Sequence, residues 1–483
     1  MDPQQPTAYK AQPSTTAAKG FLEVQLMGET PLDKRSAVWS GILVAVLGAF
    51  GFLSQTYISG DSVAVISGSE ALRDCLVGGV QVGCTGTNQF GLPQYILSMV
   101  VEQRWGDASQ SLGVLGWSNG LALVAYLTGI RTLFLSRQIS PWIFLTFAIS
   151  PALIYGANTF SEMLVLTAVV YWVLAVKTFR PMLAVLSAVI IFSSRETILL
   201  MVGPVLILYL LTLDRSRRSV GVVGIAAGTA VMFAFNTLKF GSLNNPVYSD
   251  PAFRTFDPKN VLSSMGGLFL SPSGGLALSW PLCLISLVIV ARTPVELRAS
   301  HFGRRFQGVV ERRGLALAVA ASLGIQIIVL SLWFAPFGWV AWGPRTLLPS
   351  LTLTILLAAI AGRSPHPRTR GGDGRSSHAM RRGRPLVLSA SGAIVASLGA
   401  APLLGYLMAG PRLVGDFVAP REPCIETPII QGDSVYYFEC LRAATWRWSG
   451  SQTQLSMDAL GSLGLIATLL VFTASFLILE RSC

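Results

Sequence analysis

The chain alternates between long apolar segments and short polar turns, and most apolar segments are long enough to cross a bilayer as a helix. We predict about twelve transmembrane helices on this pattern. Nine lie at about residues 37–55, 112–132, 163–176, 182–192, 276–290, 315–333, 347–361, 386–408 and 460–479, and three more end near 154, 214 and 236. Residues 91–105 alternate apolar and polar positions at helical spacing, which is typical of a helix lying in the membrane interface. The predicted fold is therefore an all-α polytopic membrane protein with an interfacial helix in its first outer loop.

The polar segments divide the chain into four regions. Residues 1–36 are rich in Pro, Gln, Thr and Ala, and we predict a disordered cytoplasmic tail. Residues 37–362 form the transmembrane core, and the Arg-, Gly- and Ser-rich residues 363–385 are predicted to be a disordered basic loop. Residues 386–483 hold two C-terminal spans joined by an outer loop.

Charge sets the orientation and excludes nucleic acid as a partner. Hydrophobic residues make up 52% of the 483 residues, charged residues 12%, and the net charge is +12. In this topology 25 of the 36 Lys and Arg residues lie on the inner side, so both termini are predicted to be cytoplasmic. The basic residues form short runs between spans and no single exposed face. This distribution is that of a protein in contact with membrane lipid, and nucleic acid is not needed to explain it. The 30 Arg against 6 Lys indicate a GC-rich genome, and we predict a bacterial plasma membrane.

Cysteines and histidines divide between the two sides. Cys75 and Cys84 share the first outer loop, and Cys424 and Cys440 share the last, so each pair is placed to form a disulfide, with free thiols as the alternative. The three histidines, at positions 301, 366 and 378, all lie on the inner side. An outer site therefore has no imidazole for a serine triad or a His-ligated metal, and its chemistry must use carboxylates and cations.

Asp61 stands a few residues beyond the first span, and two interpretations are open. It is either a functional acid at the membrane face or the cap of a helix over residues 63–75. Other charged residues also lie at outer ends of spans, where each alone is an ordinary membrane anchor, and Arg195 could pair with its neighbour Glu196. Together, cations and carboxylates on one side suit an anionic phosphate donor. The charged residues on this side, besides Asp61, include Glu70, Asp74, Glu162, Arg195, Glu196, Lys239, Arg254 and Arg345.

Three stretches carry a resemblance to a known family. They are residues 236–242 (Asn-Thr-Leu-Lys-Phe-Gly-Ser), residues 267–281, and residues 342–349 (Trp-Gly-Pro-Arg-Thr-Leu-Leu-Pro), which open the tenth span. With the acid after the first span and the interfacial helix, their order resembles that of the GT-C superfamily of polyprenyl-phosphate-sugar-dependent membrane glycosyltransferases. The resemblance covers roughly residues 37–362.

The resemblance implies a hexosyl- or pentosyltransferase that moves a sugar from a polyprenyl-phosphate donor to a glycan or lipid acceptor of the cell envelope. It places Asp61 at the acceptor hydroxyl as the candidate catalytic base. For the donor phosphate it points first to Arg345, with Arg195, Lys239 and Arg254 behind it, and we assign Glu162 and Trp342 to the acceptor or sugar. A base at the hydroxyl and cations at the departing phosphate are what such a transfer requires.

The sequence departs from the family at two points. Thr346 stands where an aromatic residue is common, and there is no large C-terminal outer domain. No second acid is placed as clearly as Asp61, so the sequence gives little support for a divalent metal site, and it identifies no other cofactor. The alternative functions are a flippase or transporter for lipid-linked sugars, which the absence of matching halves disfavours, and an inactive scaffold subunit.

Overall fold

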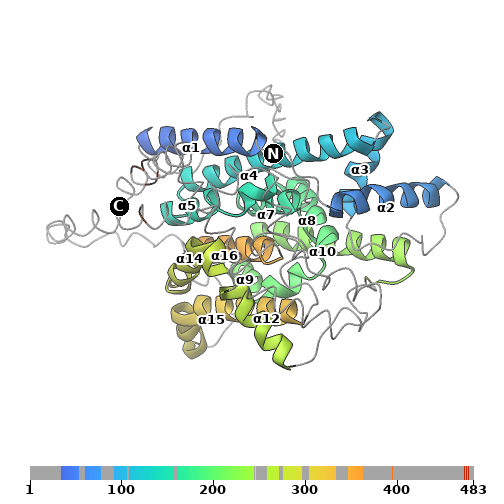
Figure 1. Cartoon of the computed structure of the whole chain (residues 1–483). Coiled ribbons are helices and arrows are strands. Elements are labelled where there is room, and N and C mark those ends of the chain that lie inside the picture. The colour runs from blue at the N-terminus through green and yellow to red at the C-terminus, as the bar shows by residue number, and fades with distance from the viewer. Residues whose placement is uncertain are drawn as a thin grey trace, which may run out of the picture.

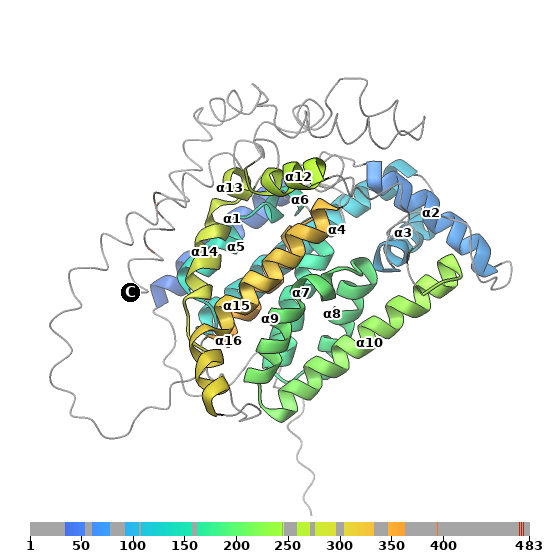
Figure 2. The same ribbon diagram turned by 90° about the horizontal axis from the view of Figure 1, so that it is seen from below.

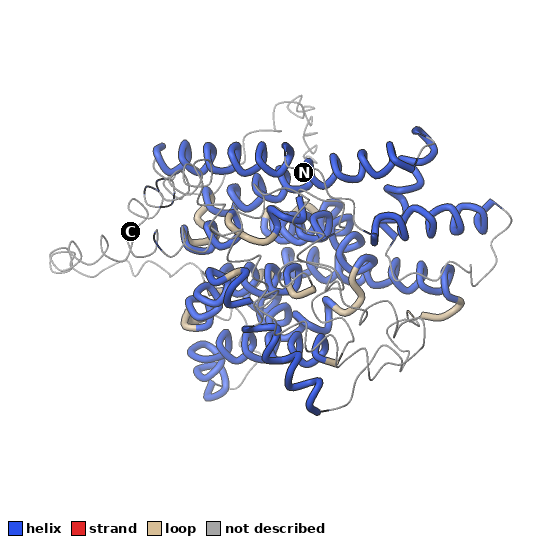
Figure 3. The backbone as a smooth tube through the Cα atoms, viewed as in Figure 1, coloured by secondary structure: helices blue, strands red, loops and turns tan. Residues whose placement is uncertain are grey.

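The computed structural model describes residues 34–53, 60–77, 92–105, 108–156, 162–243, 245, 258–270, 276–295, 304–332 and 346–362, and the single positions 394, 473, 475 and 477. Every regular element in these ranges is a helix (Figure 3), so the all-α prediction is confirmed. The helices are α1 (Lys34–Leu53), α2 (Gly60–Val77), α3 (Leu92–Trp105), α4 (Ala108–Leu135), α5 (Pro141–Ala148), α6 (Ala152–Gly156), α7 (Glu162–Lys177), α8 (Pro181–Ser194), α9 (Ile198–Thr212), α10 (Arg215–Phe240), α12 (Pro258–Leu270), α13 (Leu276–Ser279), α14 (Pro281–Ala291), α15 (Arg304–Ser331) and α16 (Leu348–Ala361).

Several of these helices have the length and composition of membrane spans. Among the described residues, Gly116–Leu135, Arg215–Phe240 and Arg313–Ser331 are long and apolar enough to cross a bilayer. Four shorter helices, α8, α9, α14 and α16, are also apolar. These features are those of a membrane protein, whereas the count of about twelve spans stays a prediction.

The third predicted span is split into two short helices. The break falls at Ser150 and Pro151, between α5 and α6. Proline removes a helical N–H and its ring clashes with the preceding turn. The Ser150 hydroxyl donates to the Phe147 carbonyl at 2.8 Å and accepts from the Ala152 N–H at 3.3 Å, so a side chain replaces part of the lost backbone ladder.

Helices α7 to α10 form an up-and-down series (Figure 1), and α10 runs along one edge of the bundle (Figure 2). Turns of a few residues join them, so consecutive helices run in opposite directions, and α8 and α10 run parallel. The close approach of α8 to α10 depends on glycine, because a Cβ on Gly228 would lie 2.6 Å from the Ala188 carbonyl oxygen and one on Gly224 would lie 3.1 Å from that of Ala184.

Helices α9, α15 and α16 pack around a buried polar group. The Gln326 amide of α15 donates to the Thr354 hydroxyl at 3.0 Å and accepts from the Ser350 hydroxyl at 3.1 Å, both on α16. All three side chains are buried. Since buried polar groups are costly unless paired, this network specifies how α15 and α16 face each other.

The alternating helix directions give the bundle two chemically different ends. We call the arginine end the one where α7 ends and α8 begins; its cations include Arg131, Arg180, Arg215, Arg217 and Arg218. There the Arg131 guanidinium donates to the Ala37 carbonyl of α1, and Arg218 donates to carbonyls that end α9. We call the opposite end, where α8 ends and α9 begins, the polar end. The candidate functional site lies there.

Candidate functional site

Five polar side chains from helices far apart in sequence meet at the polar end. We call them the ion cluster. Its members are Glu162, the first residue of α7, Arg195 and Glu196 in the α8–α9 turn, and Asn236 and Lys239 near the end of α10. The antiparallel packing of α7 on α8 and the parallel packing of α10 on α8 bring these residues to the same end of the bundle.

An ion pair joins α7 to the α8–α9 turn. The Arg195 guanidinium donates from Nη2 to Glu162 Oε1. The Glu162 side chain is 0% exposed, and that of Arg195 is 22% exposed. A carboxylate removed from water needs a counter-charge, and Arg195 supplies it. The sequence suggested that Arg195 and Glu196 could pair with each other; that alternative is wrong, because helix packing turns Arg195 toward Glu162.

Glu196 is held from the α10 side. Asn236 Nδ2 donates to Glu196 Oε1 at 2.9 Å and to the Leu243 carbonyl at 3.1 Å. Gly241 ends α10 in the left-handed conformation with φ 71°, so the chain turns back toward Glu196. Burial raises the pKa of the Glu196 carboxyl, while hydrogen bonds from Asn236 and Asn245 and the charge of Lys239 act in the opposite direction.

Lys239 is an internal cation surrounded by aromatic rings. It is 3% exposed. Its Nζ lies 4.5 Å from the centroid of the Tyr95 ring of α3, 4.8 Å from that of Phe240 and 5.8 Å from that of Phe235. Distances below about 6 Å are those of cation–π contacts. The negative ring faces and the Glu196 carboxylate favour the charged form of Lys239, whereas burial away from water opposes it.

The helix that carries Asp61 packs beside this cluster. Leu72 of α2, Tyr95 of α3 and Phe235 of α10 form a small hydrophobic cluster distinct from the main core. Asp61 lies in the first turn of α2, so the helix begins earlier than the predicted residues 63–75. At 1.5 Å per residue, Asp61 stands about 16 Å along the helix from Leu72. The structure describes the backbone of Asp61 but not its side chain.

The remaining candidates divide between described and undescribed parts of the chain. The structure pairs Glu162 with Arg195, and it places Lys239 close to Glu196, the neighbour of Arg195 in the chain. The candidates Arg254, Trp342, Arg345, Cys84, Cys424 and Cys440 lie outside the described residues. Cys75 is disulfide-bonded, but its partner is not among the described residues, so the predicted pairs stay predictions. Within the described ranges no three His, Cys, Asp or Glu residues are grouped to hold a metal.

Sequence reasoning gave no role to Asn236 and did not single out Tyr95. Asn236 opened the stretch that resembles the family motif, which was the available signal. Tyr95 was only one of several apolar positions in the expected interfacial helix. Its contact with Lys239 spans from α3 to α10 and has no local signature in the sequence.

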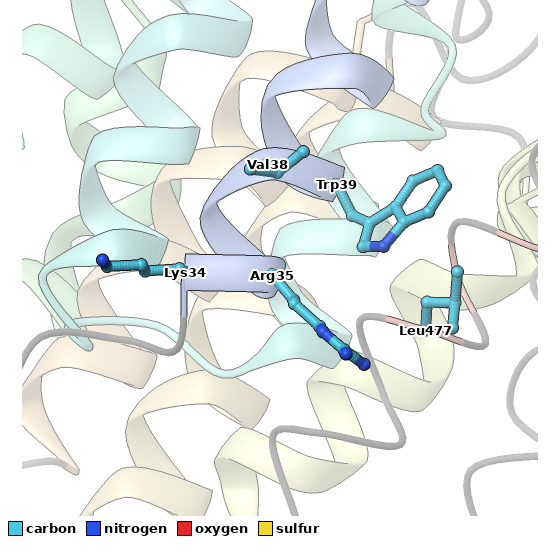
Figure 4. Close-up of a pocket in the computed structure, with 5 residues that line it drawn as sticks. All are labelled: Lys34, Arg35, Val38, Trp39 and Leu477. Atoms are coloured by element: carbon cyan, nitrogen blue, oxygen red, sulfur yellow. The ribbon is translucent and has the colours of Figure 1, made fainter.

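A hollow of about 420 Å³ lies near the start of α1, and it differs in chemistry from the ion cluster. It is lined by Lys34, Arg35, Val38, Trp39 and Leu477. Figure 4 shows Arg35 and Trp39 extending toward the segment that carries Leu477. The described residues of this lining combine cations with apolar surface.

Within the ion cluster, Arg195 has the chemistry to contact an anion in addition to Glu162. Arg195 keeps about a fifth of its side-chain surface exposed, and a guanidinium has five N–H donors, so it can contact a further anion while it pairs with Glu162. The chain matches no protein-family model, and the searches of curated proteins and of solved structures returned no match. Any functional assignment therefore rests on the residues and geometry of this chain.

Proposed function

We propose that the protein is a membrane glycosyltransferase of the GT-C type, which transfers a sugar from a polyprenyl-phosphate donor to a glycan or lipid of the cell envelope. The observation that supports this most is the ion cluster: two cations and two carboxylates from α7, α10 and the α8–α9 turn, at one end of the bundle. A cluster of this kind suits a phosphate leaving group, which needs positive charge as the bond to the sugar breaks.

The proposed topology places the ion cluster on the extracytoplasmic face. In it the chain spans the plasma membrane about twelve times with both termini in the cytoplasm, and the arginine end faces inward. The positive-inside rule supports this orientation, because many of the described arginines lie at the arginine end. The helix α16, before which Arg345 stands in the sequence, runs parallel to α9 and begins at the polar end.

The proposed roles follow from exposure and charge. Asp61 acts on the acceptor hydroxyl as a general base. Arg345 and Arg195 bind the donor phosphate, with Arg254 as a further candidate and with Trp342 near the acceptor or sugar. Glu162, which the sequence also assigned to the acceptor or sugar, is 0% exposed and paired with Arg195, so its proposed role is to orient that guanidinium. Lys239 ranks below Arg195, because a side chain that is 3% exposed must leave its aromatic surroundings before it can touch a phosphate.

The test is transfer from a panel of radiolabelled polyprenyl-phosphate sugars in reconstituted vesicles. We expect one donor to be consumed by the wild type and by Asp74→Asn, and not by Asp61→Asn at equal expression. Asp74→Asn is the matched control, because it makes the same change on the same helix at an exposed position. We expect Arg195→Lys to retain part of the activity and Arg195→Met to lose it.

Equal consumption by Asp61→Asn and the wild type would overturn the role of Asp61. If no donor is consumed while a labelled lipid-linked sugar still changes leaflet, the protein is instead a flippase. The reading as a transporter otherwise has no specific support among the described residues.

A further inference from the structure

The helices α2 and α3 pack on each other, and side chains of both also contact α10 of the bundle. Tyr95 is central to that contact. Its ring is 0% exposed, lies 6.0 Å from the Phe235 ring of α10 and belongs to the cluster with Leu72 of α2. Helix α3 packs in addition on α4 and α8. The views in Figures 1 and 2 show α2 and α3 beside the end of α10.

Tyr95 contacts Lys239 through the face of its ring and not through its hydroxyl. The Tyr95 hydroxyl has no hydrogen-bond partner among the described residues, although it is buried. The Lys239 ammonium, by contrast, stands over the ring at 4.5 Å. The ring face carries negative partial charge, so the contact is attractive only while Lys239 is charged.

Glu196 connects this contact to the ion cluster. Its carboxylate lies close enough to the Lys239 ammonium to interact with it, and Asn236 holds the carboxylate in place by a hydrogen bond of 2.9 Å. The position of α3 is thus linked through Tyr95, Lys239 and Glu196 to the α8–α9 turn, which also carries Arg195.

We propose that Tyr95 and Lys239 are positioning residues, which fix α2 and α3 against the bundle through a cation–π contact and so set the place of Asp61 relative to the ion cluster. The part of this inference that concerns Asp61 rests on the proposed function. The mechanical part does not: it states that the charge of Lys239 and the ring of Tyr95 together hold α2 and α3. A donor phosphate that draws the ammonium away would loosen this hold.

Hydrogen–deuterium exchange on the purified full chain in nanodiscs tests the mechanical part. Tyr95→Phe keeps the ring, and Tyr95→Leu keeps apolar bulk but removes the π face. We expect Tyr95→Leu to speed amide exchange in residues 60–77 and 92–105 by about tenfold and to leave α7 to α10 unchanged, and Tyr95→Phe to match the wild type. Lys239→Met should speed amide exchange in the same residues as Tyr95→Leu does, although it leaves the Tyr95 ring in place.

Unchanged exchange in both Tyr95→Leu and Lys239→Met would overturn the proposal. Equal acceleration in Tyr95→Phe and Tyr95→Leu would also overturn it, because the hydroxyl and not the cation–π contact would then be responsible.

Transfer kinetics test the role in positioning. We expect Tyr95→Leu to lower kcat about tenfold or more with the donor KM within about twofold of the wild type, and Tyr95→Phe to restore kcat. Full activity in Tyr95→Leu would refute the positioning role even if exchange responds. If no donor supports transfer by the wild type, the proposed function fails, and the exchange experiment still decides whether the Tyr95–Lys239 contact holds α2 and α3.

Discussion

The ion pair between Glu162 and Arg195 makes a sharp prediction about stability. The change Glu162→Gln keeps the shape of the side chain and removes its charge, so Arg195 remains without its counter-ion. Removing one partner of a buried ion pair costs about 3–5 kcal/mol. The Arg195 side chain is 22% exposed and therefore partly hydrated, so we expect Glu162→Gln to lower the free energy of unfolding by about 2–3 kcal/mol.

Removing the charge of the other partner, Arg195, should lower the free energy of unfolding by more. Arg195→Met leaves a carboxylate that is 0% exposed without a cation, and water cannot reach it. We expect a loss of about 3–5 kcal/mol for this variant. The double variant, Glu162→Gln with Arg195→Met, leaves no uncompensated charge and should be more stable than the sum of the single changes predicts, with a coupling energy of about 2 kcal/mol or more.

The assay is SDS-induced unfolding in mixed micelles, followed by tryptophan fluorescence, for the wild type and the three variants. The comparison among the variants matters more than any single value. The double variant should lose less stability than the sum of the losses of the two single variants. Additive losses, with a coupling energy near zero, would refute the reasoning. So would a Glu162→Gln variant within about 0.5 kcal/mol of the wild type, which is the range of ordinary surface changes.

Three further predictions follow from the packing and the buried polar groups. Gly228→Ala should lower the free energy of unfolding by about 1–3 kcal/mol, because its Cβ would stand 2.6 Å from the Ala188 carbonyl oxygen. Gly324→Ala, whose Cβ would have nothing within 4 Å, should raise the free energy of unfolding in the same SDS assay by up to about 1 kcal/mol. Gln326→Leu should cost about 1–3 kcal/mol in that assay, because it leaves buried hydroxyls of α16 without their amide partner. Burial raises the pKa of the Glu196 carboxyl above its ordinary 4.5, so the folded chain holds this proton more tightly than the unfolded chain. The stability that this group contributes is therefore full below pH 4.5 and falls as the pH rises through the raised pKa. In unfolding measurements made over a series of pH values, Glu196→Gln should remove that fall.

Much of the helical layout was predictable because its causes are local. The predicted span at 182–192 corresponds to α8 and the interfacial helix at 91–105 to α3, since apolar periodicity and proline positions act within a few residues. Capping is equally local: Asp214 accepts from the Arg217 N–H at 2.9 Å to begin α10. The split of the third span shows where prediction from average hydropathy fails. A Ser-Pro pair inside an apolar run breaks the helix, although the average hydropathy of the run is unchanged.

The candidate site was predictable only as a set of charged residues, not as a set of contacts. Glu162 and Arg195 are 33 positions apart, and Glu196 and Asn236 are 40 apart. Nothing in the sequence distinguishes these pairings from the pairing of the neighbours Arg195 and Glu196.

By itself the sequence determined that this is an all-helical chain with the composition of a membrane protein, because the length and hydrophobicity of each segment decide whether it forms an apolar helix. Only the tertiary structure decided which helix ends meet. Packing at Gly228 sets α8 against α10, antiparallel packing of α7 and α8 brings Glu162 to Arg195, and the end of α10 places Lys239 on Tyr95. The physical reason is that a helix carries its own backbone hydrogen bonds wherever it lies, whereas a buried charge is stable only beside the partner that packing brings to it.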